Sequence, residues 1–322
     1  MVVFKKNKGF NITHVNARKR KQNKKNFDSF FLQLIWIIPG LFFIGVFVFF
    51  SLYMVIKNGT NGSPRPIYEW YLSAWNFKAI LTDQTFLIAL KNSLLYVVVT
   101  VPIGLVISIL CAKALSSILN KRIFSFVQGV FFLPYVTSAM AVAMAFSFIF
   151  SSSSGGVFNQ FMGLFGIDSV AWLKDSRYAI FTVFIFGIWK TLPFQIVMLT
   201  SAFIRINKQY YAAASIDGMS KWKQFWRITM PQLTPMIVYL TTLALIASFK
   251  VLPLGLFGNE AEAEKVNAQT IIFWIYERTT GSSTNAISYP KAGAASLFLM
   301  FIILAVTVVN RFITKKLAVR YK

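Results

Sequence analysis

The stretch FLIALKNSLLYVVVTVPIGLVISILCA, residues 86–112, holds a single charged side chain, Lys91. The hydrocarbon core of a bilayer is roughly 30 Å thick, and about 20 helical residues cross it. A backbone inside that core must pair its polar groups internally, so the stretch is predicted to be one membrane-spanning helix. Comparable apolar runs cover residues 30–56, 124–150, 178–204, 233–257 and 292–313. The sequence therefore predicts an all-α membrane protein with six transmembrane helices.

The overall composition agrees with lipid as the solvent. Of the 322 residues, 56% are hydrophobic and 13% are charged, whereas a soluble domain averages about 25% charged residues. The only cysteine, Cys111, cannot form an intrachain disulfide and is expected to be a packing residue. The only histidine is His14. No cluster of metal-ligand residues is visible, so neither a metal nor a cofactor is expected.

The basic residues are distributed in the way that membrane orientation requires. Residues 1–28 are predicted to be a basic cytoplasmic tail, and residues 29–322 a single six-helix transmembrane domain. If the N-terminus is cytoplasmic, the inside segments hold 22 Lys and Arg residues and the outside loops hold 8. This bias predicts a multi-pass protein of the cell membrane with both termini in the cytoplasm. The net charge of +23 therefore needs no nucleic-acid partner.

Prolines interrupt five of the six runs. Proline in a spanning helix removes one backbone hydrogen bond, and it is tolerated where neighbouring groups satisfy the freed carbonyl. Such positions are also common where helices bend around a pathway. The prolines are Pro39, Pro102, Pro134, Pro193 and Pro253.

The segment YYAAASIDGMSKWKQFWRITMPQLTP, residues 210–235, lies on the inside between the fourth and fifth runs. Its Ala-rich start favours a short helix. Asp217 and Gly218 form a turn signal, and a glycine closes a helix by adopting positive φ. Ser220 is placed to cap a second short helix, which Pro231 and Pro235 are predicted to help end. The alanines at 212–214 offer a flat surface on which another protein can dock.

This segment resembles the coupling loop, or EAA…G motif, of binding-protein-dependent ABC importer permeases. The family has Glu where this chain has Ala212, and in the family that Glu pairs with a basic residue of the ATPase. The resemblance therefore does not carry this one ion pair over. It implies a coupling loop over residues 205–232, with contacts to the ATPase from Tyr211, Ala212, Ala213, Ala214, Asp217, Gly218, Phe225 and Pro231. The matches are Tyr211, Ala213, Ala214, Asp217, Gly218, Phe225, Ile228, Pro231, Leu233 and Pro235.

Other segments look like the carbohydrate subgroup of this family, the maltose and multiple-sugar type, and like its first permease. They are residues 76–94, 189–194 and 248–252. The resemblance implies an ABC importer type I permease fold that moves a sugar or oligosaccharide by alternating access. It also implies a second related permease, a cytoplasmic ATPase dimer and an extracytoplasmic solute-binding protein as partners. This chain would neither bind nor hydrolyse ATP.

Two lysines fall well inside predicted spans, Lys190 and Lys250. A charge in hydrocarbon is costly, so such residues face a bundle interior or a cavity. The predicted spans contain no Asp, Glu or His, which argues against proton coupling and leaves no catalytic group. The two lysines either make packing and gating contacts or contact the substrate. Trp189 either packs or stacks on a sugar ring.

Two alternatives remain open at this point. The first keeps the family but replaces the sugar with glycerol phosphate or a related anion, which the positive charge of Lys190 and Lys250 would suit. The second is a membrane-embedded enzyme or an ion channel. That class needs intramembrane catalytic groups or a filter-like repeated loop, and the sequence shows neither. It also lacks a phosphate-binding Gly-Lys-Ser loop.

Overall fold

The computed structural model describes residues 32–62, 69–153, 155–281 and 285–320. The chain divides into two compact units. The first ends at Ile56, and the second begins at Lys57. The predicted basic tail, residues 1–28, lies outside the described residues. Within them, all regular secondary structure is helical, and only isolated bridges have β geometry.

In the first unit, the predicted run 30–56 is helical throughout its described part. The helix Leu32–Thr60 contains a π-helical turn, η1 (Gly45–Phe50), and continues as α2 (Ser51–Thr60) into the second unit. Its bulky apolar side chains are exposed, for example Trp36 at 86% and Phe47 at 69%. Lipid tails are as apolar as these side chains, so such a surface suits a bilayer and not water.

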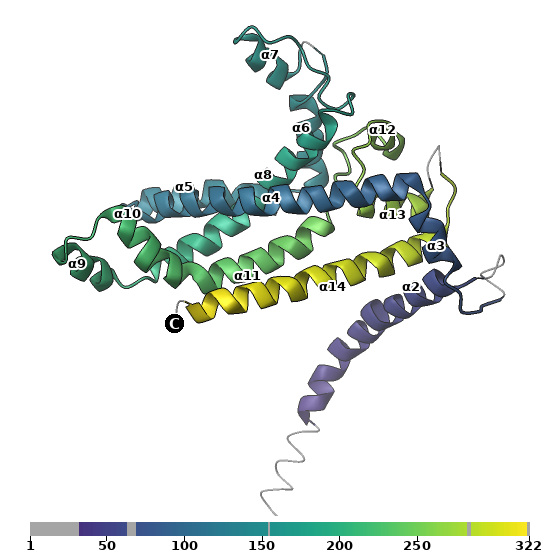
Figure 1. The fold of residues 1–322 in the computed structure, drawn as a ribbon, viewed down its shortest axis with the longest axis horizontal. Coiled ribbons are helices and arrows are strands. Elements are labelled where there is room, and N and C mark those ends of the chain that lie inside the picture. Colours follow the sequence, from purple (N-terminus) through teal and green to yellow (C-terminus); the bar gives the residue numbers. More distant parts are fainter. Residues whose placement is uncertain (1–31, 63–68, 154, 282–284, 321–322) are drawn as a thin grey trace, which may run out of the picture. The chain divides into compact units, whose positions relative to one another are not determined.

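The second unit is built on four long helices. These are α4 (Gln84–Ser116), α8 (Ala179–Ile204), α11 (Met230–Phe249) and α14 (Tyr289–Arg320). α4 packs against α8 and α11, and α11 packs against α14 (Figure 1). Each of the four is long and apolar enough to cross a membrane.

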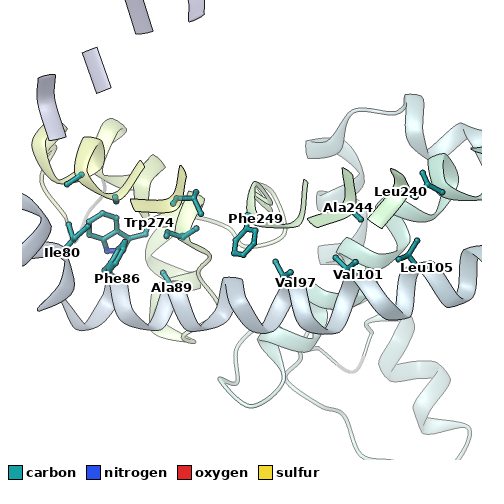
Figure 2. Packing of buried hydrophobic residues seen from close by; sticks show 14 of the residues in the cluster. Ile80, Phe86, Ala89, Val97, Val101, Leu105, Leu240, Ala244, Phe249 and Trp274 are labelled. Atoms are coloured by element: carbon teal, nitrogen blue, oxygen red, sulfur yellow. The ribbon is translucent and has the colours of Figure 1, made fainter. Parts of the chain in front are cut away.

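The core of the second unit follows one face of α4. Figure 2 shows Phe86, Val97 and Leu105 spaced along this helix and directed toward side chains of other elements. Trp274 lies against Phe86 with ring centroids 5.1 Å apart, in the edge-to-face geometry that aromatic pairs prefer. Polar side chains join the same helices, because Ser108 Oγ donates to Gln195 Oε1 at 2.9 Å. The interface is therefore both packed and hydrogen-bonded.

The third apolar run is broken into two helices, although we predicted one helix over residues 124–150. α5 (Lys121–Val136) and α6 (Ala139–Ile149) meet at an angle of 97°. Pro134 has no N–H for the last turn of α5, which weakens that turn before the break. Among the described residues the structure thus has five candidate spans, and the six-helix prediction is confirmed when this bent pair counts as one span.

The fifth run also differs from its prediction, because the helix ends at Phe249 and not near residue 257. Pro253 therefore lies beyond α11 and does not kink it. Pro231 and Pro235 do not end a helix either, since Lys221–Phe249 is continuous. A π-helical turn, η2 (Phe225–Thr229), lies within this continuous helix just before Pro231, which is in the first turn of α11.

Short helices join the long ones at the two ends of the bundle. Figure 1 shows α9 and α10 at one end of α4, and α3 and α13 at the other. A spanning helix carries its two ends to opposite sides of a bilayer, so these two groups of short helices face opposite sides of the membrane. The short helices are α3 (Trp75–Leu81), α7 (Val157–Gly163), α9 (Lys208–Ile216), α10 (Lys221–Gln224), α12 (Glu260–Lys265) and α13 (Ile271–Thr280).

Candidate functional site

The segment between α8 and α11 forms the two short helices that the sequence predicts. Asn207 begins α9 by accepting a hydrogen bond from the backbone N–H of Gln209. Gly218 ends it with φ +71°, the left-handed conformation expected there. The N–H of Met219 then donates to the carbonyl of Ala214 at 2.9 Å. Ser220 caps α10, as predicted.

Side-chain hydrogen bonds fix the angle between the two short helices. Gln224 Nε2 donates to Ser215 Oγ at 3.1 Å and to the carbonyl of Met219 at 2.9 Å. The hydroxyls of Tyr211 and Thr229 are 2.7 Å apart, which ties α9 to the start of α11. These contacts make the segment a preorganised unit and not a loose loop.

The outer face of this unit is apolar and exposed. Ile216 is 87% exposed, Trp222 69% and Trp226 49%. Trp222 lies edge-to-face on Trp226 with centroids 5.7 Å apart. Bulky apolar side chains gathered at the end of a bundle mark a protein interaction surface. We call these three residues and Tyr210, which is also half exposed, the coupling face.

The sequence-predicted residues of this segment are partly exposed and partly buried. Ala212 and Ala213 are exposed, as are Asp217 and Gly218. Ala214 is buried, and Tyr211 and Pro231 are half buried. Phe225 is buried under Lys113, whose Nζ lies 4.4 Å from the ring centroid. The exposed alanine surface is thus narrower than predicted, because Ala214 is buried.

Lys190 binds the break between α5 and α6. Its Nζ donates to the carbonyl of Pro134 at 2.8 Å and to that of Thr137 at 3.0 Å. A cation at a helix C-terminus satisfies carbonyls that have no intrahelical donor. Trp189, the next residue, packs on Phe146 with ring centroids 5.1 Å apart. These two residues of α8 therefore hold α5 and α6 in their bent arrangement.

Lys250 has a different environment. It follows the last residue of α11 as its C-cap, and its side chain is exposed. Among the residues that the structure describes, it forms no side-chain hydrogen bond or ion pair. Of the two intramembrane lysines found by sequence, Lys250 is the one whose ammonium remains available to another molecule.

A cavity of about 670 Å³ lies beside α6, and sequence reasoning missed it. One side of the cavity is a face of α6, and the other is the loop that follows α11, together with α13. Apolar side chains such as Phe148 and Phe257 alternate with polar ones such as Asn259 and Tyr276. The full lining is Met140, Met144, Ser147, Phe148, Ser151, Ser152, Leu173, Lys174, Leu254, Gly255, Leu256, Phe257, Gly258, Asn259, Glu262, Phe273 and Tyr276.

The lining of this cavity combines apolar walls with a few polar groups. A sugar presents apolar C–H faces and hydroxyl edges, and sites for such ligands combine apolar walls with a few polar groups. Lys174 and Glu262 bring one positive and one negative charge to the lining. The Glu262 carboxylate already accepts a hydrogen bond from the N–H of Gly258 at 2.9 Å.

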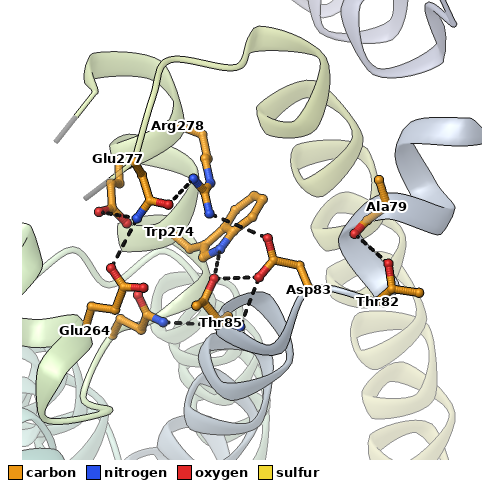
Figure 3. A network of polar contacts seen from close by, with 10 residues as sticks. Ala79, Thr82, Asp83, Thr85, Glu264, Trp274, Glu277 and Arg278 are labelled. Atoms are coloured by element: carbon orange, nitrogen blue, oxygen red, sulfur yellow. Dashed lines mark hydrogen bonds and ion pairs between the residues drawn. The ribbon is translucent and has the colours of Figure 1, made fainter. Parts of the chain in front are cut away.

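A polar network closes the same end of the bundle (Figure 3). Arg278 is buried and lies 3.5 Å from the carboxylate of Asp83, the residue that caps α4. Its guanidinium also lies over the ring of Trp274, at 4.8 Å. The indole N–H of Trp274 donates to Thr85 Oγ1 at 2.9 Å. This network connects α13 to the beginning of α4. No sequence motif predicted it.

No group of three or more potential metal ligands occurs in the described ranges. The cavity beside α6, the coupling face and the two lysines are therefore the features from which a function is built. They define a helical membrane protein with exposed apolar side chains at one end and an amphipathic cavity toward the other.

Comparisons with known proteins identify the class. The family described as binding-protein-dependent transport system inner membrane component matches residues 104–321. The chain belongs to this family. It is therefore a membrane subunit of a transport system and not an enzyme or an ion channel.

Individual relatives agree with the family assignment. Probable ABC transporter permease protein MG188 of Mycoplasma genitalium is 31% identical over 277 residues, which are 84% of this chain and 81% of that protein. The arabinooligosaccharides transport system permease protein AraP of Halalkalibacterium halodurans is 28% identical, covering 82% of this chain and 83% of the relative. The predicted carbohydrate subgroup is thereby supported.

A solved structure shows the same fold. A chain of a bacterial ABC transporter involved in the import of the acidic polysaccharide alginate superimposes with a TM-score of 0.75. The match covers 92% of this chain and 99% of that chain, at 22% identity. The predicted importer permease fold is confirmed.

Proposed function

We propose that this chain is the permease subunit of an ATP-driven importer that moves a neutral sugar or oligosaccharide into the cytoplasm. The observation that supports a sugar as the substrate is the amphipathic cavity beside α6, whose lining includes one lysine and one glutamate. AraP, a relative over most of its length, is named for the transport of arabinooligosaccharides. Glycerol phosphate is less favoured, because the ammonium of Lys190 is already bound to two backbone carbonyls.

The proposed partners follow from the two ends of the bundle. The coupling face would dock on a cytoplasmic ATPase, and an ATPase dimer requires a second coupling face from a related permease. The opposite end, with the cavity and the Asp83–Arg278 network, would receive substrate from an extracytoplasmic binding protein. ATP-driven closure of the ATPase would move the coupling segments together and open the cavity side.

The test of this function is reconstitution of the chain in vesicles with the permease, ATPase and binding protein encoded beside its gene. A neutral oligosaccharide should stimulate ATP hydrolysis and enter the vesicles. Glycerol phosphate should do neither at equal concentration. Stimulation by glycerol phosphate alone would replace the sugar with the anionic substrate.

The membrane orientation is proposed from the basic-residue bias, with both termini cytoplasmic. A reporter fused after Ser153, between α6 and α7, is expected to lie outside. A reporter fused after Ser220, between α9 and α10, is expected to lie inside. Activity of both reporters on the same side would contradict the proposed topology.

The two intramembrane lysines should respond differently to methionine. Lys190→Met leaves the carbonyl of Thr137 without its described side-chain donor and removes one of the two side-chain donors to the carbonyl of Pro134, which also accepts from Thr137 Oγ1. Leaving such a group unsatisfied costs about 1–3 kcal/mol. Lys190→Met should therefore lower the thermal unfolding temperature of the purified protein. Lys250→Met removes no described contact, so it should leave stability unchanged and alter only the substrate dependence of uptake.

The comparison separates packing from substrate contact. Thermal unfolding and initial uptake rates at varied substrate concentration are measured on both variants. Lys190→Arg, which retains a donor, should recover part of the lost stability. Equal stability of the parent and Lys190→Met would mean that the lysine does not hold the break.

A further inference from the structure

A second cavity, of about 700 Å³, lies behind the coupling segment and not on the coupling face. It is enclosed by the end of α4, the connection to α5, the end of α8 and the inner sides of α9 and α10. Its lining is Lys113, Ser116, Ser117, Ile118, Leu119, Lys121, Phe124, Phe203, Ile204, Ile206, Lys208, Tyr211, Lys221, Gln224, Phe225 and Thr229.

The charge of this cavity is strongly one-sided. Four lysines line it and no carboxylate does: Lys113, Lys121, Lys208 and Lys221. None of the four forms an ion pair within the described ranges. Lys113 instead lies over the ring of Phe225. Like charges around one cavity repel each other, so an anion bound between them lowers the free energy of the arrangement.

Backbone dipoles act in the same direction. Lys121 is the first residue of α5 and Lys208 the first residue of α9. Both helices thus begin at the cavity wall, and the positive ends of their dipoles add to the lysine charges. The ligand of this cavity is therefore an anion.

The rest of the lining identifies which kind of anion fits. Leu119 is 93% exposed and Ile204 is 58% exposed, and Phe124 and Phe203 lie beside them. These residues stand at the ends of α4 and α8 or at the start of α5, where spans leave the membrane. A free phosphate uses only the lysines. A phospholipid uses the lysines for its headgroup and the apolar side chains for its acyl chains.

We propose that this cavity binds the headgroup phosphate of an anionic phospholipid from the adjacent leaflet. Basic pockets between helices at the membrane boundary bind such headgroups. The lipid neutralises Lys113 of α4, Lys121 of α5, and Lys208 and Lys221 of the coupling segment. It thereby joins the ends of the spans to the two short helices. This role is separate from the docking of the coupling face and holds whatever the transported substrate is.

The test uses native mass spectrometry of the full-length chain purified from an equal mixture of phosphatidylglycerol and phosphatidylcholine. The parent should retain one phosphatidylglycerol in preference to phosphatidylcholine. A quadruple variant should retain at least about tenfold less phosphatidylglycerol, because each lysine near a phosphate contributes to binding. It carries Lys113→Gln, Lys121→Gln, Lys208→Gln and Lys221→Gln. The double variant Lys113→Gln, Lys208→Gln should show an intermediate loss of bound phosphatidylglycerol. It replaces the quadruple variant in the test if the quadruple variant does not fold.

A matched control removes four charges from the same end of the protein without touching the cavity lining. It is Arg122→Gln, Arg205→Gln, Lys223→Gln, Arg227→Gln, and it should retain the lipid. Equal loss in this control, or equal retention of the two lipids by the parent, would overturn the proposal. Displacement of phosphatidylglycerol by inorganic phosphate at constant ionic strength would show that the cavity binds a free anion and not a lipid.

Discussion

Gly218→Val is expected to leave the protein folded in the membrane and to weaken its hold on the ATPase. The φ of Gly218 is +71°, where a residue with a Cβ costs about 1–2 kcal/mol and a β-branched residue costs more. No atom lies within 4 Å of the position a Cβ would take, so the effect is backbone strain and not a clash. The chain relieves this strain by returning to negative φ.

That relaxation would break the contacts that set the angle between α9 and α10. The N–H groups of Gly218 and Met219 donate to the carbonyls of Ser215 and Ala214 at 3.1 and 2.9 Å, and both bonds depend on the left-handed residue. Ile216 precedes the turn and Trp222 follows it, so the coupling face would be split. Co-purification of the ATPase should fall by at least about tenfold, which corresponds to about 1.4 kcal/mol, and transport should be lost.

The chain supplies a control of the same strain. Gly166 has φ +72° and also has nothing within 4 Å of its Cβ position, but it lies between α7 and α8, away from the coupling segment. Gly166→Val should therefore keep ATPase binding. Gly218→Asn should keep most of it too, because Asn tolerates the left-handed region. Full ATPase binding and transport by Gly218→Val would remove the physical basis of the coupling assignment.

Gly187→Ala should be among the most destabilising single substitutions in the second unit. A Cβ on Gly187 of α8 would overlap the hydroxyl of Tyr96 and lie 2.5 Å from its Cζ. Tyr96 is 2% exposed and its ring meets Phe184 edge-to-face, so the ring has no free space into which to move. α4 and α8 must separate, and overpacking of this kind costs about 1–3 kcal/mol or more.

The measurement is the yield and thermal unfolding temperature of the detergent-solubilised protein. Gly104→Ala is the matched control, because it lies in the same α4–α8 interface and its Cβ would be an ordinary 3.6 Å from Gln195. It should be tolerated. Tyr96→Ala should restore part of the stability of Gly187→Ala, since it removes the opposing ring. Unchanged stability of Gly187→Ala alone would show that the helices are not held this closely.

The coupling segment shows how far local sequence can predict a site. Ala-rich residues, an Asp-Gly turn and a cap at Ser220 all act over a few residues, and the structure confirms the turn at Gly218 and the cap. The resemblance to the coupling motif predicted the family of this chain, and the family match over residues 104–321 confirms that prediction. The tryptophans of the coupling face went unpredicted, because exposure of Trp222 and Trp226 depends on how η2 is rotated.

The substrate side was less predictable. Lys190 was recognised as unusual, but its partners are carbonyls more than 50 positions away in the chain, at a helix break that hydropathy does not reveal. The cavity beside α6 is lined by segments around residues 140–152, 173–174, 254–262 and 273–276. No local pattern indicates that such segments meet.

By itself the sequence determined that lipid is the solvent, that the chain is helical and where its apolar runs lie, and it predicted a coupling segment at residues 205–232. These follow from properties read over one helix or one turn, namely hydropathy, glycine conformation and capping. Only the tertiary structure decided that α5 and α6 bend, that Lys190 holds the bend, and that two cavities of different charge lie at different places in the bundle. Those features depend on which helix faces meet, and close approaches such as that of Gly187 to Tyr96 are set by three-dimensional packing.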